Sequence, residues 1–191
     1  MQRKKWHILS LLLICTFLVS LIVPTSVSAA QKKHSKKVLV VYFSATGTTK
    51  EAAKKVKKAT NGTLYKITAQ KKYTKKDLDY TNDNCRANKE QQNSKVRPKI
   101  KGRIKNIRKY DIIFVGYPIW WGKEPKIIRT FLESYNLKGK IIIPFCTSGG
   151  SGISGSIRGI KSSAKGAKVK SGKDLTDSSY RTIKNWVKKK L

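Results

Sequence analysis

The sequence predicts an α/β fold in which a doubly wound, open parallel sheet of five strands is covered by helices on both faces. Two observations lead to this prediction. Apolar runs rich in β-branched residues, with the length of buried strands, recur along the chain. Segments with apolar residues at helical spacing separate them, and this alternation is typical of parallel sheets with right-handed crossovers.

The first predicted strand, residues 38–43, runs into a loop of hydroxyl side chains at residues 44–49. A helix is expected at 50–59, so the loop lies at a helix N-terminus, where unpaired N–H groups and the helix dipole favour an anion. Gly47 can adopt positive φ and bring the backbone close to a ligand. Ser and Thr also cap helices that bind nothing, and on these residues alone both readings stand. The candidate anion ligands are Ser44, Ala45, Thr46, Gly47, Thr48 and Thr49.

A second strand is predicted at 63–68, followed by a polar, lysine-rich segment at 70–105. Within that segment a helix is expected near 85–94, and Pro98 marks a break. Ile100, Ile104 and Ile107 recur at helical spacing, which predicts a short helix before the third strand.

The second half of the chain repeats the alternation. Strands are predicted at 112–116 and 141–145, with a helix at 125–135 between them. A helix at 151–162 and a weak strand at 167–170 follow. The chain ends in an amphipathic helix with Tyr180, Ile183, Trp186 and Val187 facing inward.

Two further loops follow the third and fourth strands. In a doubly wound sheet, ligands sit beyond the carboxyl ends of the strands, where these loops and the hydroxyl loop would meet. One loop offers aromatic planes, although one of its two tryptophans is expected to be a packing residue. The other offers glycines that a flat ligand could approach. The candidates are Pro118, Ile119, Trp120, Trp121 and Gly122, then Thr147, Ser148, Gly149, Gly150, Ser151 and Gly152. Together the three loops suit a phosphorylated aromatic cofactor.

The chain resembles the flavodoxin-like family, and in particular its secreted or membrane-associated bacterial branch. The resemblance rests on SATGTT at 44–49, GYPIWWGKEP at 116–125, FLESYNLKGK at 131–140 and PFCTSGGSG at 144–152, together with the segments 73–80 and 86–98. It implies strand order 2-1-3-4-5 and an FMN-binding domain at residues 37–191. It also implies that Ser44, Thr46, Thr48 and Thr49 bind the phosphate of FMN, that Trp120 or Trp121 stacks on the isoalloxazine, and that 147–152 border its other edge.

The first thirty residues have the three-part pattern of a signal peptide. Arg3, Lys4 and Lys5 precede an apolar run at 8–23, and small residues end the segment at 27–30. An uncleaved N-terminal anchor is the alternative. Residues 31–36 form a basic polar tail. The mature protein is therefore expected outside the cytoplasm, secreted or held at the cell surface or membrane.

The chain has 43 basic and 10 acidic residues, a formal net charge of +33. Three of the positive charges belong to the predicted leader, which leaves +30 for the remainder. Such a charge predicts adhesion to anionic cell-wall polymers or a membrane surface. The lysines are scattered and accompany no nucleic-acid-binding module, so a specific nucleic-acid role is not favoured.

Cysteine and histidine usage narrows the chemistry. Cys85 and Cys146 follow the leader; export permits a disulfide between them, but Cys146 ends an apolar run and is expected to be a core residue. No Cys/His cluster has metal-site spacing, and His34 is the only histidine after the leader, which argues against a histidine-dependent hydrolase.

Three functions agree with these expectations. The first is an exported FMN flavoprotein that transfers electrons to a partner protein or a small acceptor. The second is an FMN-dependent oxidoreductase, driven by NAD(P)H, that reduces a small molecule such as a quinone. The third is a basic surface-binding protein with a vestigial flavin site. No catalytic side chain is assigned, because the flavin would supply the redox chemistry.

Overall fold

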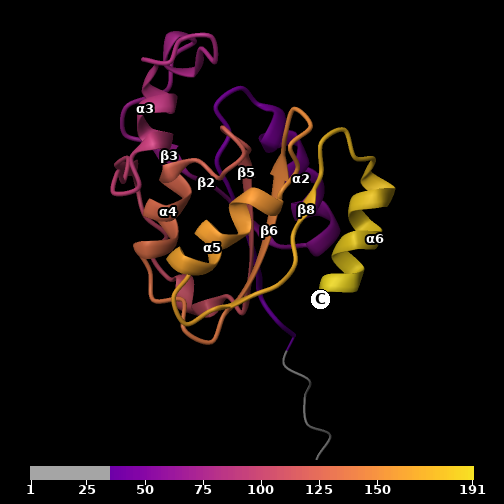
Figure 1. Cartoon of the computed structure of the whole chain (residues 1–191). Helices are drawn as coiled ribbons and strands as arrows, with labels where there is room; N and C mark the ends of the chain where they lie inside the picture. Colours follow the sequence, from indigo (N-terminus) through magenta and orange to yellow (C-terminus); the bar gives the residue numbers. More distant parts are fainter. Residues whose placement is uncertain (1–34) are drawn as a thin grey trace, which may run out of the picture. The chain divides into compact units, whose positions relative to one another are not determined.

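A parallel sheet forms the centre of residues 35–191, which are the residues described by the computed structural model (Figure 1). Its strand order is β2-β1-β5-β6-β7. A sixth strand, β8, also pairs with β6, nearer to the carboxyl end of β6 than β7 does. The strands are β1 (Val38–Tyr42), β2 (Thr63–Lys66), β5 (Ile112–Pro118), β6 (Ile141–Thr147), β7 (Lys168–Val169) and β8 (Lys173–Asp174). The predicted doubly wound α/β fold is therefore confirmed, and its fifth position is occupied by two short strands rather than one.

The three central strands are buried on both faces, as their unbroken apolar sequences require. Val38 pairs with Ile112, and Ile112 in turn pairs with Ile141. Phe114 and Val115, which point to opposite faces of β5, are both fully buried. Such strands need a layer of helices on each side.

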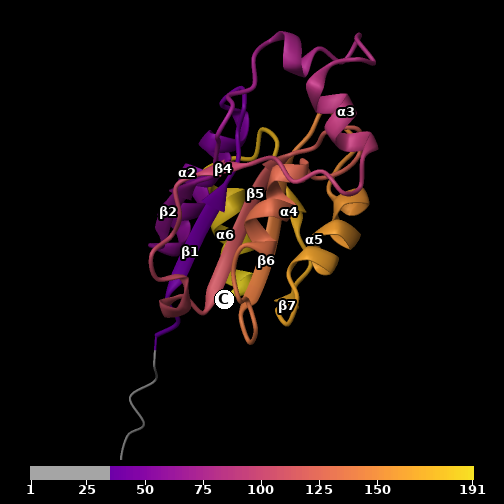
Figure 2. The same ribbon diagram turned by 90° about the vertical axis from the view of Figure 1, so that its left-hand side faces the viewer.

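Helices supply these layers (Figure 2). On one face, α2 (Thr48–Thr60) and α6 (Tyr180–Lys190) pack against each other and the sheet, with Val56, Ile183 and Trp186 in one core cluster. On the other face, α4 (Lys126–Glu133) and α5 (Ile157–Ser163) bury Ile127, Phe131 and Ile160 in a second cluster. In α6, Ile183, Trp186 and Val187 face inward as predicted, whereas Tyr180 is only half-buried.

Residues 67–110 form a segment between β2 and β5 that lies largely over one end of the sheet. It contains α3 (Arg86–Gln92), which confirms the predicted helix, and the 3-10 turns Lys76–Leu78 and Ile107–Lys109. It also contains a two-stranded antiparallel ribbon of β3 (Thr68–Ala69) and β4 (Ile100–Lys101). Figure 2 shows α3 beyond the end of the sheet that lies away from the C-terminus.

The helix predicted from Ile100, Ile104 and Ile107 is wrong. Ile100 pairs with Ala69 in the ribbon, and Gly102 at φ 80° turns the chain out of it. Ile104 and Ile107 still pack on the core, Ile104 from irregular backbone and Ile107 from the 3-10 turn. The helix predicted at 151–162 begins later, as the 3-10 turn Ser154–Ser156 leading into α5.

The predicted signal peptide or anchor at 1–30, and most of the tail at 31–36, lie outside the described residues. Within residues 35–191, no helix combines the length and the apolar sequence needed to cross a membrane. Cys85 and Cys146 are both buried and carry free thiols, so they do not form the disulfide that export would permit.

Candidate functional site

A pocket of about 320 Å³ lies at the carboxyl ends of the strands and is lined by all three predicted loops. Ten candidate residues line it: Ala45, Thr46, Thr48, Thr49, Pro118, Ile119, Trp120, Thr147, Ser148 and Gly149. Seven lie in the same loops but not in the lining: Ser44, Gly47, Trp121, Gly122, Gly150, Ser151 and Gly152. Leu78 and Tyr80, which the sequence analysis did not select, complete the wall.

The hydroxyl loop forms the polar part of the pocket. Gly47, at φ 109°, is the N-cap of α2, and its N–H donates to Ser44 Oγ at 3.1 Å. The Thr49 hydroxyl is buried and bonded to the Thr147 hydroxyl at 2.8 Å, so it ties this loop to β6. Thr46 and Thr48 are exposed and line the pocket. Together with the N–H groups at the start of α2, they are the donors that an anion could reach.

The loop at residues 118–122, which we call the aromatic loop, contains a tight turn. Trp120 and Lys123 exchange backbone hydrogen bonds of 2.9 and 3.0 Å, and the two residues between them, Trp121 and Gly122, have φ of 47° and 72°. Two positive φ angles define the turn that best connects antiparallel strands, but Asn or Gly usually occupies both positions. A tryptophan there is strained, and such strain is concentrated at functional sites.

The two tryptophans have different environments. Trp120 is 4% exposed, and its ring packs edge-on against Phe43 and Tyr73, with centroids 5.6 and 5.1 Å away. Trp121 is half-exposed and stacks on Tyr80, with centroids 4.4 Å apart and planes 28° from parallel. Trp120 is therefore the packing residue that the sequence analysis expected one of the pair to be. Tyr80 lines the pocket, and Trp121, which stacks on it, lies in the same loop as Trp120 but outside the lining.

Tyr80 is the main residue that sequence reasoning missed. It is 54% exposed, whereas most large apolar side chains of residues 35–191 are covered. An aromatic residue in an otherwise polar, lysine-rich segment is the signal that could have pointed to it. Its contact with Trp121 joins positions 41 residues apart, which no local pattern reports.

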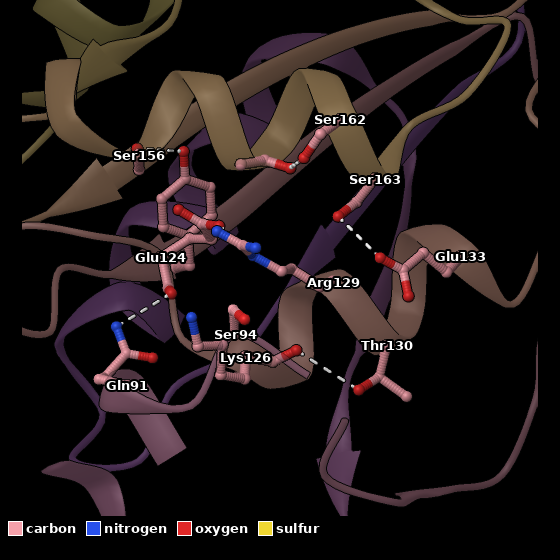
Figure 3. A network of polar contacts seen from close by, with 12 residues as sticks. Gln91, Ser94, Glu124, Lys126, Arg129, Thr130, Glu133, Ser156, Ser162 and Ser163 are labelled. Carbon is pink, nitrogen blue, oxygen red and sulfur yellow. Dashed lines mark hydrogen bonds and ion pairs between the residues drawn. The ribbon is translucent and has the colours of Figure 1, made fainter. Parts of the chain in front are cut away.

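A buried polar network that includes Gln91, Glu124 and Arg129 supports the aromatic loop; Figure 3 shows these three side chains close together. The side-chain amide of Gln91 on α3 donates to the carbonyl oxygens of Trp120 and Glu124, at 2.9 and 3.2 Å. Glu124 is fully buried and paired with Arg129, with 2.6 Å between Oε1 and Nε. Gly159 leaves the room that this carboxylate occupies, because a Cβ there would collide with Glu124 Oε1. The pair and the amide fix the backbone at both ends of the turn.

A second residue that the sequence did not point to, Asp174 at the end of β8, organises the glycine-rich loop at residues 147–152. Its carboxylate accepts hydrogen bonds from the hydroxyls of Ser148 and Thr176, both at 2.5 Å. Ser148 Oγ in turn accepts from the N–H groups of Gly150 and Gly152, at 3.2 and 3.1 Å. Burial alone would raise the pKa of Asp174, but the hydroxyl and backbone hydrogen bonds outweigh it and lower that pKa. The ionised carboxylate therefore holds the loop in shape.

The residues present fit a phosphorylated aromatic ligand. Hydroxyl and N–H donors stand at one part of the pocket, and Tyr80, on which Trp121 stacks, stands at another. Gly149 leaves its wall open, since nothing lies within 4 Å of the position that a Cβ would take. The lining within residues 35–191 contains no Asp, Glu, His, Lys or Arg.

Comparisons with known proteins agree with this geometry. Residues 37–190 match a family model described as Flavodoxin. A candidate flavoprotein from Bacteroides eggerthii is 45% identical over 80% of this chain and 96% of its own, with a TM-score of 0.76. Another from Bacteroides uniformis is 44% identical over 80% and 98% of the two chains, with a TM-score of 0.77.

A flavoprotein from Lactobacillus acidophilus, solved in complex with FMN, is more distant. It is 26% identical over 75% of this chain and 95% of its own, with a TM-score of 0.61. A search of curated proteins gave no match.

Proposed function

The chain belongs to the flavodoxin family, and from this premise we propose that it binds FMN non-covalently at the carboxyl end of its sheet and transfers electrons. The observation that carries the proposal is the meeting of all three predicted loops around one pocket. The FMN complex of the Lactobacillus acidophilus relative supports the choice of cofactor.

Each part of the pocket has a role in this proposal. Thr46 and Thr48, with the N–H groups at the start of α2, hold the phosphate, while Ser44 and Thr49 hold the loop through their bonds to Gly47 and Thr147. Tyr80 in the pocket wall, with Trp121 stacked on it, would hold the isoalloxazine. The loop 147–152 borders its other edge, where Gly149 leaves space.

The flavin supplies the redox chemistry, and the protein orients it and adjusts its environment. The pocket lining holds no carboxylate, imidazole, amine or guanidinium within the described part of the chain. Passing single electrons requires no such acid–base group, which favours electron transfer as the function. The partner would be a redox protein or a small acceptor.

Flavin absorption tests the cofactor. The purified protein, supplied with excess FMN and desalted, should retain the visible bands of bound flavin. Thr46→Ala/Thr48→Ala should weaken FMN binding by at least about a hundredfold, since each of the two lost hydrogen bonds to a charged group contributes about 1.5–3 kcal/mol and 1.4 kcal/mol is tenfold. The control Thr63→Ala/Ser162→Ala removes two hydroxyls far from the pocket and should leave binding unchanged. A folded protein that stays colourless would overturn the proposal.

Turnover separates electron transfer from small-molecule reduction. The FMN-loaded protein is mixed with NAD(P)H and a quinone, with no other protein present. An electron-transfer protein should show no sustained turnover under these conditions. Many turnovers would instead assign the oxidoreductase function that the sequence analysis left open.

The proposal includes export, supported by the charged, apolar and small-residue parts of segment 1–30. N-terminal sequencing of the protein recovered outside the cytoplasm should find a start close to residue 31. Recovery of the intact chain in the membrane fraction would indicate the anchor instead.

A further inference from the structure

Positive charge gathers at the end of the sheet that lies away from the pocket. Five segments meet there, before the amino ends of the strands: 35–37, 61–62, 103–111, 134–140 and 164–168. We call them the amino-end surface. They carry ten cations and one carboxylate, Asp111; the cations are Lys36, Lys37, Arg103, Lys105, Arg108, Lys109, Lys138, Lys140, Lys165 and Lys168. All ten except the half-buried Lys140 are exposed.

Backbone hydrogen bonds hold these segments side by side. The N–H of Asp111 donates to the carbonyl of Lys37 at 2.9 Å, and the N–H of Ile141 donates to the carbonyl of Asp111 at 3.0 Å. The N–H of Gly139 donates to the carbonyl of Gly166 at 3.0 Å. The cations therefore belong to one continuous surface rather than to separate loops.

The pocket end of the sheet has a different balance. Its segments 44–50, 67–99, 117–125, 148–156 and 173–179 carry twelve cations but also seven carboxylates. The one carboxylate of the amino-end surface is already engaged, because Asp111 Oδ2 accepts from the N–H of Lys37 at 2.8 Å. Glu133, next to the surface, is paired with Arg97 at 2.6 Å. The excess of positive charge per residue is thus greater at the amino-end surface than at the pocket end.

This surface is hollowed by a groove of about 550 Å³. Arg103, Lys105 and Arg108 line it together with Ser134, Tyr135 and Asn136. The guanidinium of Arg103 is fixed in place, since it lies 5.5 Å from the centre of the Tyr135 ring and donates to the Ser134 carbonyl at 3.3 Å. A fixed guanidinium beside two exposed cations in a concave wall suits repeated contact with phosphate oxygens.

The groove and its composition identify the class of partner. A flat membrane cannot enter a concave wall, whereas a flexible chain can. A nucleic acid strand would need aromatic platforms for its bases. The aromatic ring in the lining of this groove is Tyr135, and the Arg103 guanidinium, 5.5 Å from the ring centre, already packs on it, so the groove offers no row of free rings on which successive bases could stack. A single small anion would leave most of the ten cations without a role.

We propose that the amino-end surface binds a flexible polyanion with repeating phosphate groups, along the groove lined by Arg103, Lys105 and Arg108. Binding there leaves the flavin pocket, at the opposite end of the sheet, open to a redox partner. The inference does not depend on the flavin, because none of its residues lines that pocket.

Matched charge variants test the proposal, with long-chain inorganic polyphosphate as the probe. Lys105→Gln/Arg108→Gln/Lys138→Gln removes three charges from the amino-end surface. Lys71→Gln/Lys72→Gln/Lys75→Gln removes three exposed charges from the pocket end and is the control. The affinity of the purified protein for polyphosphate is measured over a series of salt concentrations, and thermal unfolding checks that each variant is folded.

We expect the amino-end variant to bind at least tenfold more weakly and the control less than threefold. The slope of log affinity against log salt should fall in magnitude by about 2 in the amino-end variant, at about 0.7 per lost phosphate contact. If the first triple fails to fold, Lys109→Gln/Lys165→Gln/Lys168→Gln takes its place with the same expectation.

Three results would overturn the proposal. Equal losses in both variants would show that net charge alone attracts the polymer. Competition by phosphatidylglycerol vesicles at the same phosphate concentration would assign the surface to a membrane. Tighter binding of single-stranded DNA would assign it to nucleic acid. FMN absorption is followed in the same samples, so loss of flavin binding and loss of polyphosphate binding are seen separately.

Discussion

Trp121 holds a backbone conformation that its side chain disfavours, beside Trp120, a buried tryptophan at the pocket wall. Its φ of 47° in the turn between Trp120 and Lys123 costs about 1–3 kcal/mol for a residue other than Gly or Asn. Its stacking on the exposed Tyr80 returns about 0.5–1.5 kcal/mol. The fold therefore has little to gain from a tryptophan at this position, whereas a flavin-binding surface does.

Substituting the two tryptophans should separate stability from flavin binding. Trp120→Ala should lower the free energy of unfolding by about 3–5 kcal/mol, as for a large aromatic lost from a core. Trp121→Asn should change it by less than about 1 kcal/mol, because relief of the turn offsets the lost stacking. Flavin affinity should nevertheless fall about tenfold in Trp121→Asn. Denaturant unfolding and FMN titration measure the two quantities, and unchanged FMN affinity in Trp121→Asn would refute the role of this ring.

Asp174 predicts a dependence of the glycine-rich loop on acid. Its pKa in the folded protein is lowered, so its ionised form stabilises the fold at any pH above the ordinary aspartate pKa of about 3.9. That contribution is lost as the pH falls through the lowered folded value. Asp174→Asn should therefore weaken FMN binding near neutral pH and reduce the loss of stability on acidification. Unfolding curves between pH 2 and pH 7, roughly the range of carboxylate titration, check this.

A control variant that removes the same charge at a neighbouring position sharpens that test. Asp177→Asn removes a neighbouring exposed carboxylate that does not bond the loop hydroxyls. It should leave FMN affinity unchanged. If both variants behave alike, the effect comes from net charge and not from the loop.

Among the elements, those with a strong local pattern were predicted and those that depend on distant partners were not. Apolar, β-branched runs such as 112–116 and 141–145 predict buried strands, and both lie in strands of the structure. Ile100 also looked helical by spacing, but its pairing with Ala69 across the ribbon determined its backbone. The short strand β8 had no apolar run to reveal it, since it is set by pairing with β6.

The same distinction applies to the site. The three loops were predicted because strand ends in a parallel sheet must converge, and ten of their residues do line one pocket. Tyr80, Gln91 and Asp174 were missed because each acts through a contact far along the chain. Gln91, for example, reaches the carbonyl of Trp120 from another element. Sequence position indicates which loops meet, but not which outside side chains hold them.

Gln91 offers a test of how α3 supports the aromatic loop. Gln91→Ala removes the donor to the carbonyls of Trp120 and Glu124, both in buried surroundings, and should lower the free energy of unfolding by about 1–3 kcal/mol. Because the turn that carries Trp121 loses its brace, FMN affinity should fall as well. The adjacent exposed Gln92→Ala is the control and should change neither. Loss of stability with intact FMN affinity would show that the loop keeps its shape without α3.

At the scale of the whole molecule, the net charge of +33 acts on any reaction that adds negative charge. Reduction of a bound flavin adds such charge, so the surrounding cations should favour it. At physiological ionic strength the screening length is about 8 Å, so the nearer cations dominate. The segment with Lys71, Lys72 and Lys75 leads directly to Leu78 and Tyr80 of the pocket wall, whereas the amino-end surface lies at the other end of the sheet.

The reduction potential of the FMN-loaded protein should therefore fall as salt is added, because screening removes the electrostatic benefit of reduction. Lys71→Gln/Lys72→Gln/Lys75→Gln should lower the potential at low salt by about 20 mV, which is about 1 kcal/mol for a two-electron couple. Lys105→Gln/Arg108→Gln/Lys138→Gln, with the same change in net charge, should leave it nearly unchanged. Redox titration at low and high ionic strength measures both effects. Equal shifts in the two variants would mean that the flavin responds to net charge regardless of position, and a potential insensitive to salt would mean that the surface charge does not reach it.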